Sequence, residues 1–222
     1  MIQTKLKIKK INISKNIILL VFKNQLEITS TFLRFQEHYE SPKFRNKIFT
    51  LDEYKLWYTS IKGKFSYYTD WNGFNIPSHI LTPFYNKQFK DLTSAENQIL
   101  ELLKNKKEEF YIIGIHKNSR NLKQVLKHET AHGLFYTNKE YKDKIQDKLK
   151  QYKLDKLKKS LLNSGGYHSE VIEDETHAYS LDYQVGYLTK IPIFLHFKLK
   201  RIYNKYIKQN KININQIIKE IK

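Results

Sequence analysis

Residues 122–135 read LKQVLKHETAHGLF, and this stretch guides the interpretation of the whole chain. Apolar residues recur in it at helical spacing, which predicts a helix over residues 121–136. His128 and His132 are four positions apart, so both imidazoles lie on one face of that helix and can bind a single ion. Glu129 lies beside the pair, where it can accept a proton without binding the metal. The stretch therefore predicts a metal centre on a helix.

A third metal ligand is expected elsewhere, because a catalytic zinc ion usually has three protein ligands and one open position. The chain has no Cys, so every ligand must be His, Asp or Glu. Residues 167–179 read YHSEVIEDETHAY and belong to a second predicted helix. The candidates in this segment are Glu175, Glu173, Glu170, His168 and His177.

The two stretches together resemble the gluzincin group of zincin metallopeptidases. In that group His-Glu-x-x-His supplies two zinc ligands. A Glu on a second helix, often within Asn-Glu-x-x-Ala, supplies the third. Asp174-Glu175-Thr-His-Ala178 matches this string with Asp in place of Asn. The resemblance covers about residues 110–183 and implies Glu175 as the third ligand.

The resemblance also implies a function. It implies that His128, His132 and Glu175 bind Zn²⁺ and that a metal-activated water hydrolyses peptide bonds of a peptide or protein substrate. Glu129 would be the general base. A further hydrogen-bond donor to the developing oxyanion is expected, and four tyrosines are candidates for it. They are Tyr136, Tyr167, Tyr179 and Tyr183.

The chain departs from the known branches at three points. The 43 residues from His132 to Glu175 exceed the interval in the aminopeptidase branch. Tyr179 stands where the thermolysin branch has an Asp that orients a ligating His. The metzincin pattern is disfavoured, because Phe135 and Asn138 occupy the positions that need Gly and His.

Outside these motifs the sequence predicts an α+β protein. In the N-terminal half we expect strands within residues 3–30 with a hairpin turn near 14–16, a helix from Thr50 to Gly63, and short strands and loops over 64–92. A helix that begins at Thr93 and a strand at 110–115 follow. After the motif helix we expect helices over 139–152, 154–163 and 169–183, and a basic helix after Pro192 with a short tail. Capping boxes are expected at Thr50, Thr93 and Thr137.

The resemblance implies a zincin-like arrangement. A small mixed sheet with an edge strand would precede an active-site helix and a mostly helical C-terminal half. The strand at 110–115 would be the edge strand that binds an extended peptide by β-addition. We divide the chain into an N-terminal α+β part of unknown role (1–92), a catalytic core (93–190) and a basic helical segment (191–222), all within one compact unit.

The charge of the chain bears on an alternative function. Its 222 residues carry a formal net charge of +18, but only four of the 40 basic residues are Arg. Arg is the preferred reader of phosphates and base edges, so this imbalance indicates non-specific contact with nucleic acid, if any. The alternative function is an inactive zincin scaffold that binds nucleic acid or anionic surfaces through its Lys-rich helices. A third possible function is that of a structural metalloprotein, in which the zinc ion is fully ligated and has no open position.

Other features of the sequence carry less information. No apolar run is long enough for a membrane span, and no secretory cleavage site follows residues 17–22, so a soluble, cytoplasmic protein is expected. We interpret the aromatic residues between 65 and 74 as core. His38, which lies between acidic residues, is expected on the solvated surface.

Overall fold

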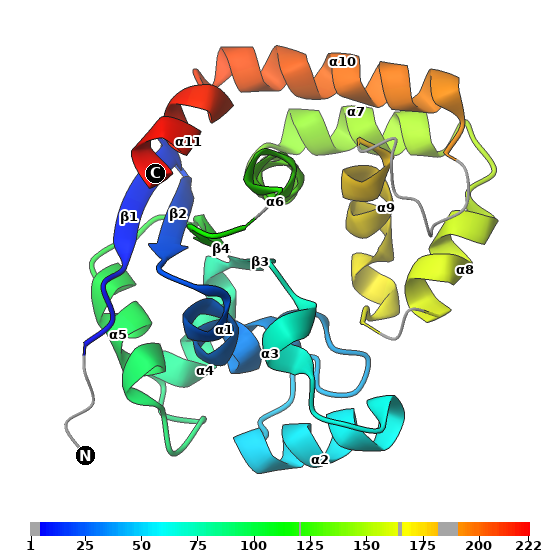
Figure 1. Cartoon of the computed structure of the whole chain (residues 1–222). Helices are drawn as coiled ribbons and strands as arrows, with labels where there is room; N and C mark the ends of the chain where they lie inside the picture. The colour runs from blue at the N-terminus through cyan, green and yellow to red at the C-terminus, as the bar shows by residue number, and fades with distance from the viewer. Residues whose placement is uncertain (1–4, 120, 164–165, 182–190) are drawn as a thin grey trace.

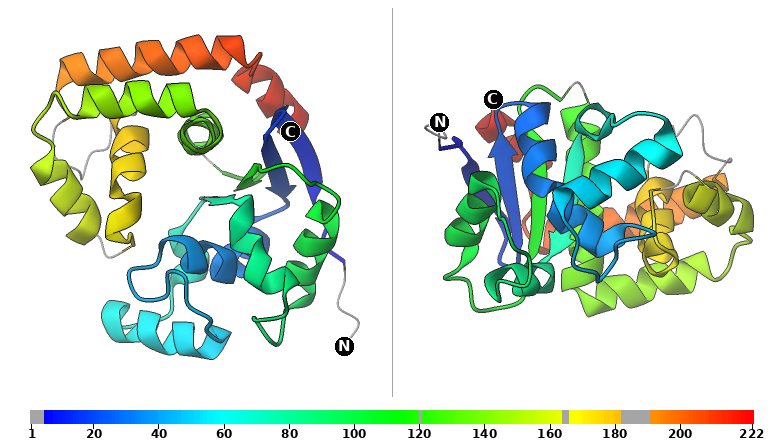
Figure 2. Two further views of the ribbon diagram at one scale, coloured as in Figure 1. Left: turned by 180° about the vertical axis from the view of Figure 1, so that it is seen from behind. Right: turned by 90° about the horizontal axis from the view of Figure 1, so that it is seen from below.

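The computed structural model describes residues 5–119, 121–163, 166–181 and 191–222, and its centre is a four-stranded sheet (Figures 1 and 2). The strand order is β1 (Lys9–Ser14), β2 (Ile17–Phe22), β4 (Tyr111–His116), β3 (Gly73–Pro77). β1 and β2 form the expected antiparallel hairpin. β2 and β4 run parallel, and β3 is antiparallel to β4. The α+β prediction is confirmed.

Helices cover both faces of this sheet. All six residues of β2 are buried, as expected for a strand between two layers. Alternate residues enter different cores: Ile17 packs with the helices on one face, and Ile18 packs with those on the other. The sequence Ile-Ile-Leu-Leu-Val-Phe therefore supplies both cores at once.

The motif helix α6 (Leu122–Thr137) lies on the first face, within one residue of its predicted bounds. Leu126 and Leu134 face the sheet and are buried. Gly133 lets the helix approach β2 closely, because a Cβ at that position would lie 2.9 Å from Cδ1 of Ile17. This contact fixes the height of the His-Glu-x-x-His segment above the sheet.

The second face carries α1 (Gln25–Glu40) and α5 (Ser94–Leu103). The strands expected through residue 30 therefore end at Phe22, and α1 is a helix that the sequence analysis missed. The side chain of Asn24 caps it by accepting from the amide of Glu27. His38 is buried in α1, not solvated, and its Nδ1 lies 2.8 Å from the carbonyl oxygen of Lys47.

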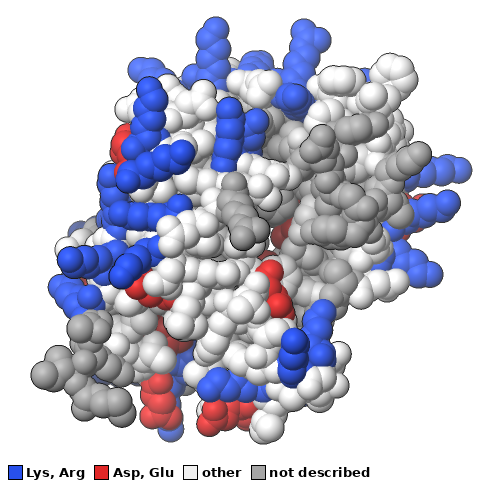
Figure 3. All heavy atoms as spheres, viewed as in Figure 1, with Lys and Arg blue, Asp and Glu red and all other residues white. Residues whose placement is uncertain are grey.

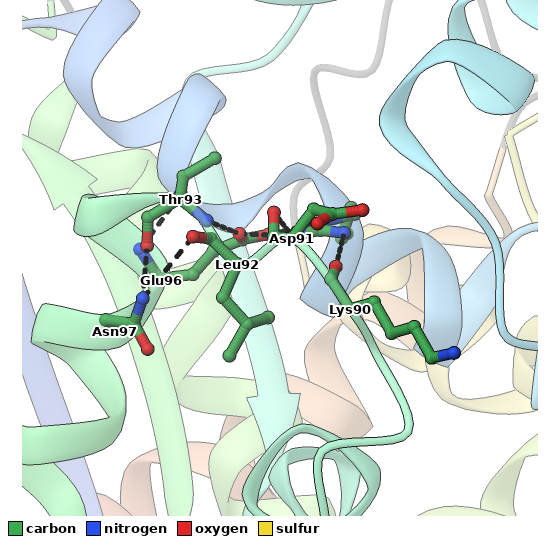
Figure 4. Close-up of polar contacts among 7 residues, drawn as sticks. Lys90, Asp91, Leu92, Thr93, Glu96 and Asn97 are labelled. Carbon is green, nitrogen blue, oxygen red and sulfur yellow. Dashed lines mark hydrogen bonds and ion pairs between the residues drawn. The ribbon is translucent and has the colours of Figure 1, made fainter.

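A buried ion pair joins α1 to α5. Arg34 donates to both carboxylate oxygens of Glu96, at 2.7 and 2.5 Å, and the two side chains are only 4% and 2% exposed. Glu96 also completes the predicted capping box with Thr93, in which each residue accepts from the other's amide (Figure 4). One carboxylate thus caps α5 and binds it to α1.

Short elements connect α1 to α5. The helix expected after Thr50 is present as α2 (Leu51–Lys62), with its capping box and with Gly63 in the left-handed conformation. Residues 64–92 were expected as strands and loops, but only β3 is a strand. The others are short helices: α3 (Tyr67–Asp70), η1 (Ser78–Leu81) and α4 (Thr82–Tyr85). Of the aromatic residues between 65 and 74, Tyr67 and Phe74 are fully buried, which confirms core packing for them.

After α6 the described chain is helical. Its elements are α7 (Lys139–Leu149), α8 (Asp155–Asn163), η2 (Ser169–Val171), α9 (Ile172–Ser180), α10 (Ile193–Gln209) and α11 (Ile214–Ile221). The helix expected over 169–183 thus begins as η2, and its last two residues lie outside the described ranges. α7 and α10 lie side by side (Figure 1).

Two details differ from the expectation in this half. Asn138, not Thr137, caps α7, because its side chain accepts from the amide of Tyr141. Thr137 still belongs to α6, where its hydroxyl donates to the carbonyl of Gly133. The expected C-terminal tail is the helix α11, whose Ile217 and Ile221 are buried.

The strand at 110–115 is not an edge strand, which corrects the expectation. β4 lies between β2 and β3, so its backbone is paired on both sides. The edge strand next to α6 is β3, a five-residue segment too short to show a clear alternation in sequence. In the ranges that the structure describes, no helix combines the length and apolar character needed to cross a membrane.

Candidate metal centre

A cleft of about 470 Å³ opens beside the motif helix. One side of it, which we call the motif wall, is formed by α6 and α9 and carries His128, Glu129 and Glu175. The other side, which we call the opposite wall, is formed by α1, α3 and β3 and carries Glu37 and Asn75. The cleft therefore lies between the sheet layer and the C-terminal helices.

The structure brings the three expected ligands together. One donor atom from each of His128, His132 and Glu175 lies within 4.8 Å of the others. Nε2 of His132 is 3.2 Å from Nε2 of His128 and 3.6 Å from Oε1 of Glu175. Ligand atoms of a tetrahedral zinc site, at about 2.1 Å from the ion, are about 3.4 Å apart. The donor types fit a zinc ion, and two of the three spacings are close to this value.

Behind His132 lies a chain of polar contacts. Its Nδ1 is 2.9 Å from Oδ2 of Asp174, and Oδ1 of Asp174 is 3.5 Å from Nδ1 of His177. Nε2 of His177 is in turn 2.8 Å from the hydroxyl of Tyr141. When Nδ1 of His132 donates to Asp174, Nε2 keeps its lone pair for a metal. Asp174 therefore orients the ring of His132, one of the candidate ligands.

These contacts govern the ionisation of the histidines. Burial opposes a charge on His132, but the carboxylates of Asp174 and Glu175 raise its pKa to about 10. Burial and the charge of His132 lower the pKa of His128 well below its usual range. Burial opposes the charge of Asp174 too, but His132 lowers its pKa to about 2. Because a metal binds the neutral ring, zinc binding should release a proton from His132.

Glu129 is held by the opposite wall. Its Oε2 accepts a 2.6 Å hydrogen bond from the side-chain amide of Asn75 on β3, whose own carbonyl oxygen accepts from Tyr111. A Cβ on Gly73 would lie 2.5 Å from Oε1 of Glu129, so only glycine leaves room for this carboxylate. Burial raises the pKa of Glu129 to about 7, against the opposing effects of His132 and Asn75. The group is thus suited to accept and return a proton near neutral pH.

The rival ligands point elsewhere. Glu173 accepts from Gln146, and Glu170 pairs with Arg45 at an exposed position. Nδ1 of His168 accepts from the amide of Glu170. His177 is buried against Tyr141. None of the four belongs to the group of donor atoms around His132 in the described chain.

Two of the four candidate tyrosines line the cleft. The hydroxyls of Tyr167 and Tyr179 are 2.9 Å apart, and the ring of Tyr179 stands edge-on to His128 with centroids 4.8 Å apart. Tyr136 lies beside His79, outside the cleft lining. Tyr183 lies outside the described residues.

The acidic residues of α1 were not among the predicted site residues. Burial raises the pKa of Glu37 to about 7, against the opposing effect of the nearby hydroxyls of Tyr67, Tyr54 and Ser41. Burial, together with the nearby Glu175, raises the pKa of Glu40 well above its usual range. The sequence signal that could have revealed this helix is the pair Asn24 and Glu27, a helix-start pattern.

The charge of the cleft contrasts with that of the whole chain. No Lys or Arg is among its described lining residues, whereas the chain carries a net charge of +18. Figure 3 shows acidic side chains at a hollow near the centre of the view, while Lys and Arg stand on the outer surface along the top, the left side and the right edge. A cation such as Zn²⁺ would therefore meet no repelling Lys or Arg among the described lining residues.

No family model, no curated protein and no solved structure matches this chain, so its chemistry has to be inferred from its own residues.

Proposed function

We propose that the chain is a zinc-dependent metallopeptidase with a gluzincin-like centre. The observation that carries the proposal is the convergence of two imidazole nitrogens and one carboxylate, within 4.8 Å of one another, beside the separately held carboxylate of Glu129. Three ligands plus an uncoordinated carboxylate in an open cleft is the arrangement of a hydrolytic zinc site, not of a closed structural one.

Each residue would have a distinct task. A zinc ion held by His128, His132 and Glu175 would polarise the scissile carbonyl and lower the pKa of a water molecule. Glu129 would accept the proton and return it to the leaving amine, with Asn75 keeping its carboxylate in position. Asp174 would hold the ring of His132. Tyr167 and Tyr179 supply hydroxyls in the cleft for the developing oxyanion.

Three features support a zincin-like arrangement. An antiparallel edge strand, β3, lies beside the motif helix. A second helix, α9, brings Glu175 to it. Asp174 supplies the orienting carboxylate that the thermolysin branch has at the position of Tyr179. β-Addition along β3 is not part of the proposal, because the amide of Asn75 already donates to Gln36.

The test is Glu129→Gln, which keeps the shape of the side chain and removes its basicity. The variant should retain the zinc content and stability of the wild type and lose peptide hydrolysis by roughly 10²–10⁴-fold, the contribution of a positioned base. Cleavage of a mixed peptide library and zinc content would be measured in both proteins. Glu101→Gln, an equivalent change on the exposed surface of α5, is the control.

The outcomes separate the candidate functions. Equal hydrolysis by wild type and Glu129→Gln would remove Glu129 as the base. Zinc binding without hydrolysis in either protein would favour a structural metal site. Anion binding is the second candidate function, because α7 and α10 are rich in Lys. Sequence-selective binding of nucleic acid that resists salt would favour this function over the peptidase.

A further inference from the structure

A second cavity, of about 380 Å³, lies on the other side of His128. It is enclosed by α6, the end of α9 and α10, with Ala178 and Leu181 as apolar lining. His128 and Gln124 line both this cavity and the acidic cleft, so the two spaces meet at the metal centre. A group bound in the second cavity would therefore lie next to the ion that the proposed function requires.

The charge of this cavity is opposite to that of the cleft. Lys123 and Lys127 contribute from successive turns of α6, and Lys200 contributes from α10. The described lining contains no Asp or Glu. Within the described ranges, none of these three ammonium groups forms an ion pair, whereas Lys139 and Lys144 on α7 each have a carboxylate partner. Among the described residues, three positive charges are thus held together without a carboxylate partner.

Polar side chains complete the lining. The side chains of Tyr203, Asn204 and His196 border the cavity beside the lysines. Lysine ammoniums act as point charges, and the lining has none of the planar Arg forks that favour bidentate binding of phosphate. The apolar lining residues Ala178 and Leu181 suit the methylene groups of a short side chain. A single carboxylate on a short aliphatic stem matches this combination.

We propose that this basic pocket binds a carboxylate of the peptide substrate and selects peptides with a negative charge close to the cleaved bond. The carboxylate is either an Asp or Glu side chain or the C-terminus of the peptide. This inference rests on the proposed peptidase function. It adds that the charge of the substrate is unevenly distributed. The anionic part of the substrate lies by Lys127 and Lys200, and the part in the cleft faces the acidic residues.

The first experiment sequences the cleavage products of a random peptide library. Asp, Glu or a free C-terminus should be enriched at one position near the cut. Matched peptides with Glu or Gln at that position should then differ about 10-fold in kcat/KM, the effect of roughly one charge-assisted hydrogen bond. A second pair, with a free or an amidated C-terminus, separates the two sources of the carboxylate.

Variants locate the effect. Lys127→Gln and Lys200→Gln should each lower kcat/KM for the Glu peptide toward the value for the Gln peptide, and so remove most of the preference for Glu over Gln. Lys198→Gln is the matched control, because Lys198 is on the same helix but packs on Tyr152 outside the pocket. The double variant Lys127→Glu/Lys200→Glu should invert the preference toward a Lys peptide. Loss of charge preference in Lys198→Gln alone would contradict the assignment.

A binding measurement separates this inference from the proposed function. Titration of the Glu and Gln peptides into Glu129→Gln should show tighter binding of the Glu peptide, which Lys127→Gln abolishes in the same background. Selective binding without any hydrolysis by wild type would support the pocket and refute the peptidase. Hydrolysis that is indifferent to charge, or binding that is equal for both peptides, would refute the pocket.

Discussion

The two walls of the cleft differ in how far apart in sequence their interacting residues are. The motif wall carries candidate metal ligands on two helices, and His128 lies close in sequence and in space to His132, the third candidate. The opposite wall binds no metal by the donor geometry of the described residues, yet Asn75 and Gly73 determine where the carboxylate of Glu129 lies. Chemistry can thus be local in sequence, while its positioning depends on contacts between distant residues.

The largest expected effect is on the stability of the opposite wall. Arg34→Met leaves the carboxylate of Glu96 buried without its partner, so the free energy of unfolding should fall by about 3–5 kcal/mol. Denaturant unfolding measures this change. Lys139→Met removes an exposed pair with Asp143, 87% and 52% exposed, and should cost less than about 1 kcal/mol. Similar losses in the two variants would contradict the distinction.

Glu37 gives a pH-dependent test of the same wall. Its pKa is raised from 4.5 to about 7 by burial, so the folded state holds its proton after the unfolded chain has lost it. The folded form is therefore penalised progressively as pH rises from about 4.5 to 7. Relative to wild type, Glu37→Gln should gain about 3 kcal/mol between pH 4 and pH 8. Unfolding with a chelator present measures this gain, and a pH-independent difference would refute it.

The third test addresses the contact between the walls. Gly73→Ala places a Cβ 2.5 Å from Oε1 of Glu129 and 2.7 Å from Cγ1 of Val125, so the carboxylate should move while the three candidate ligands stay in place. Hydrolysis should fall by about 10²-fold, since displacement of a catalytic group by about 1 Å has effects of that size. The zinc content should stay at the wild-type level. Loss of zinc together with activity would mean that the position of Glu129 and the binding of zinc are not independent.

The smallest effect is expected behind the motif wall. Asp174→Asn weakens the orientation of His132 and should lower zinc affinity about 10–100-fold, as measured by competition with a chelator. Glu173→Gln is the matched control, because this neighbour contacts Gln146 and not a ligand. Equal affinities of the Asp174→Asn and Glu173→Gln variants would remove Asp174 as the orienting residue.

The walls also differ in what the sequence predicted. α6 was predicted to within one residue, because helical spacing and the His-Glu-x-x-His string are local patterns. α1 was missed because its buried residues include Arg34, Glu37 and Glu40, which hide the apolar period. Their burial depends on partners such as Glu96, 62 residues away in sequence. A tertiary ion pair of this kind leaves no periodic signal.

Strand order was beyond local patterns for a similar reason. The segment 110–115 was correctly predicted as a strand, but whether it lies at the edge depends on the pairing of β3, which no short-range feature encodes. Asn75 is one polar residue in a short apolar strand, and its role becomes visible only with Glu129, 54 positions later. Asp174 was noticed as part of a ligand string, whereas its contact with His132 required the folded helix pair.

The most direct test of the account is the zinc content of the purified protein and of its His128→Ala/His132→Ala variant. Elemental analysis should find about one zinc per chain in wild type and almost none in the variant, because Glu175 alone cannot hold the ion. His79→Ala, which removes a histidine beside Tyr136 and outside the cleft lining, should keep the wild-type content. Stoichiometric zinc in the double variant would contradict the metal centre proposed here.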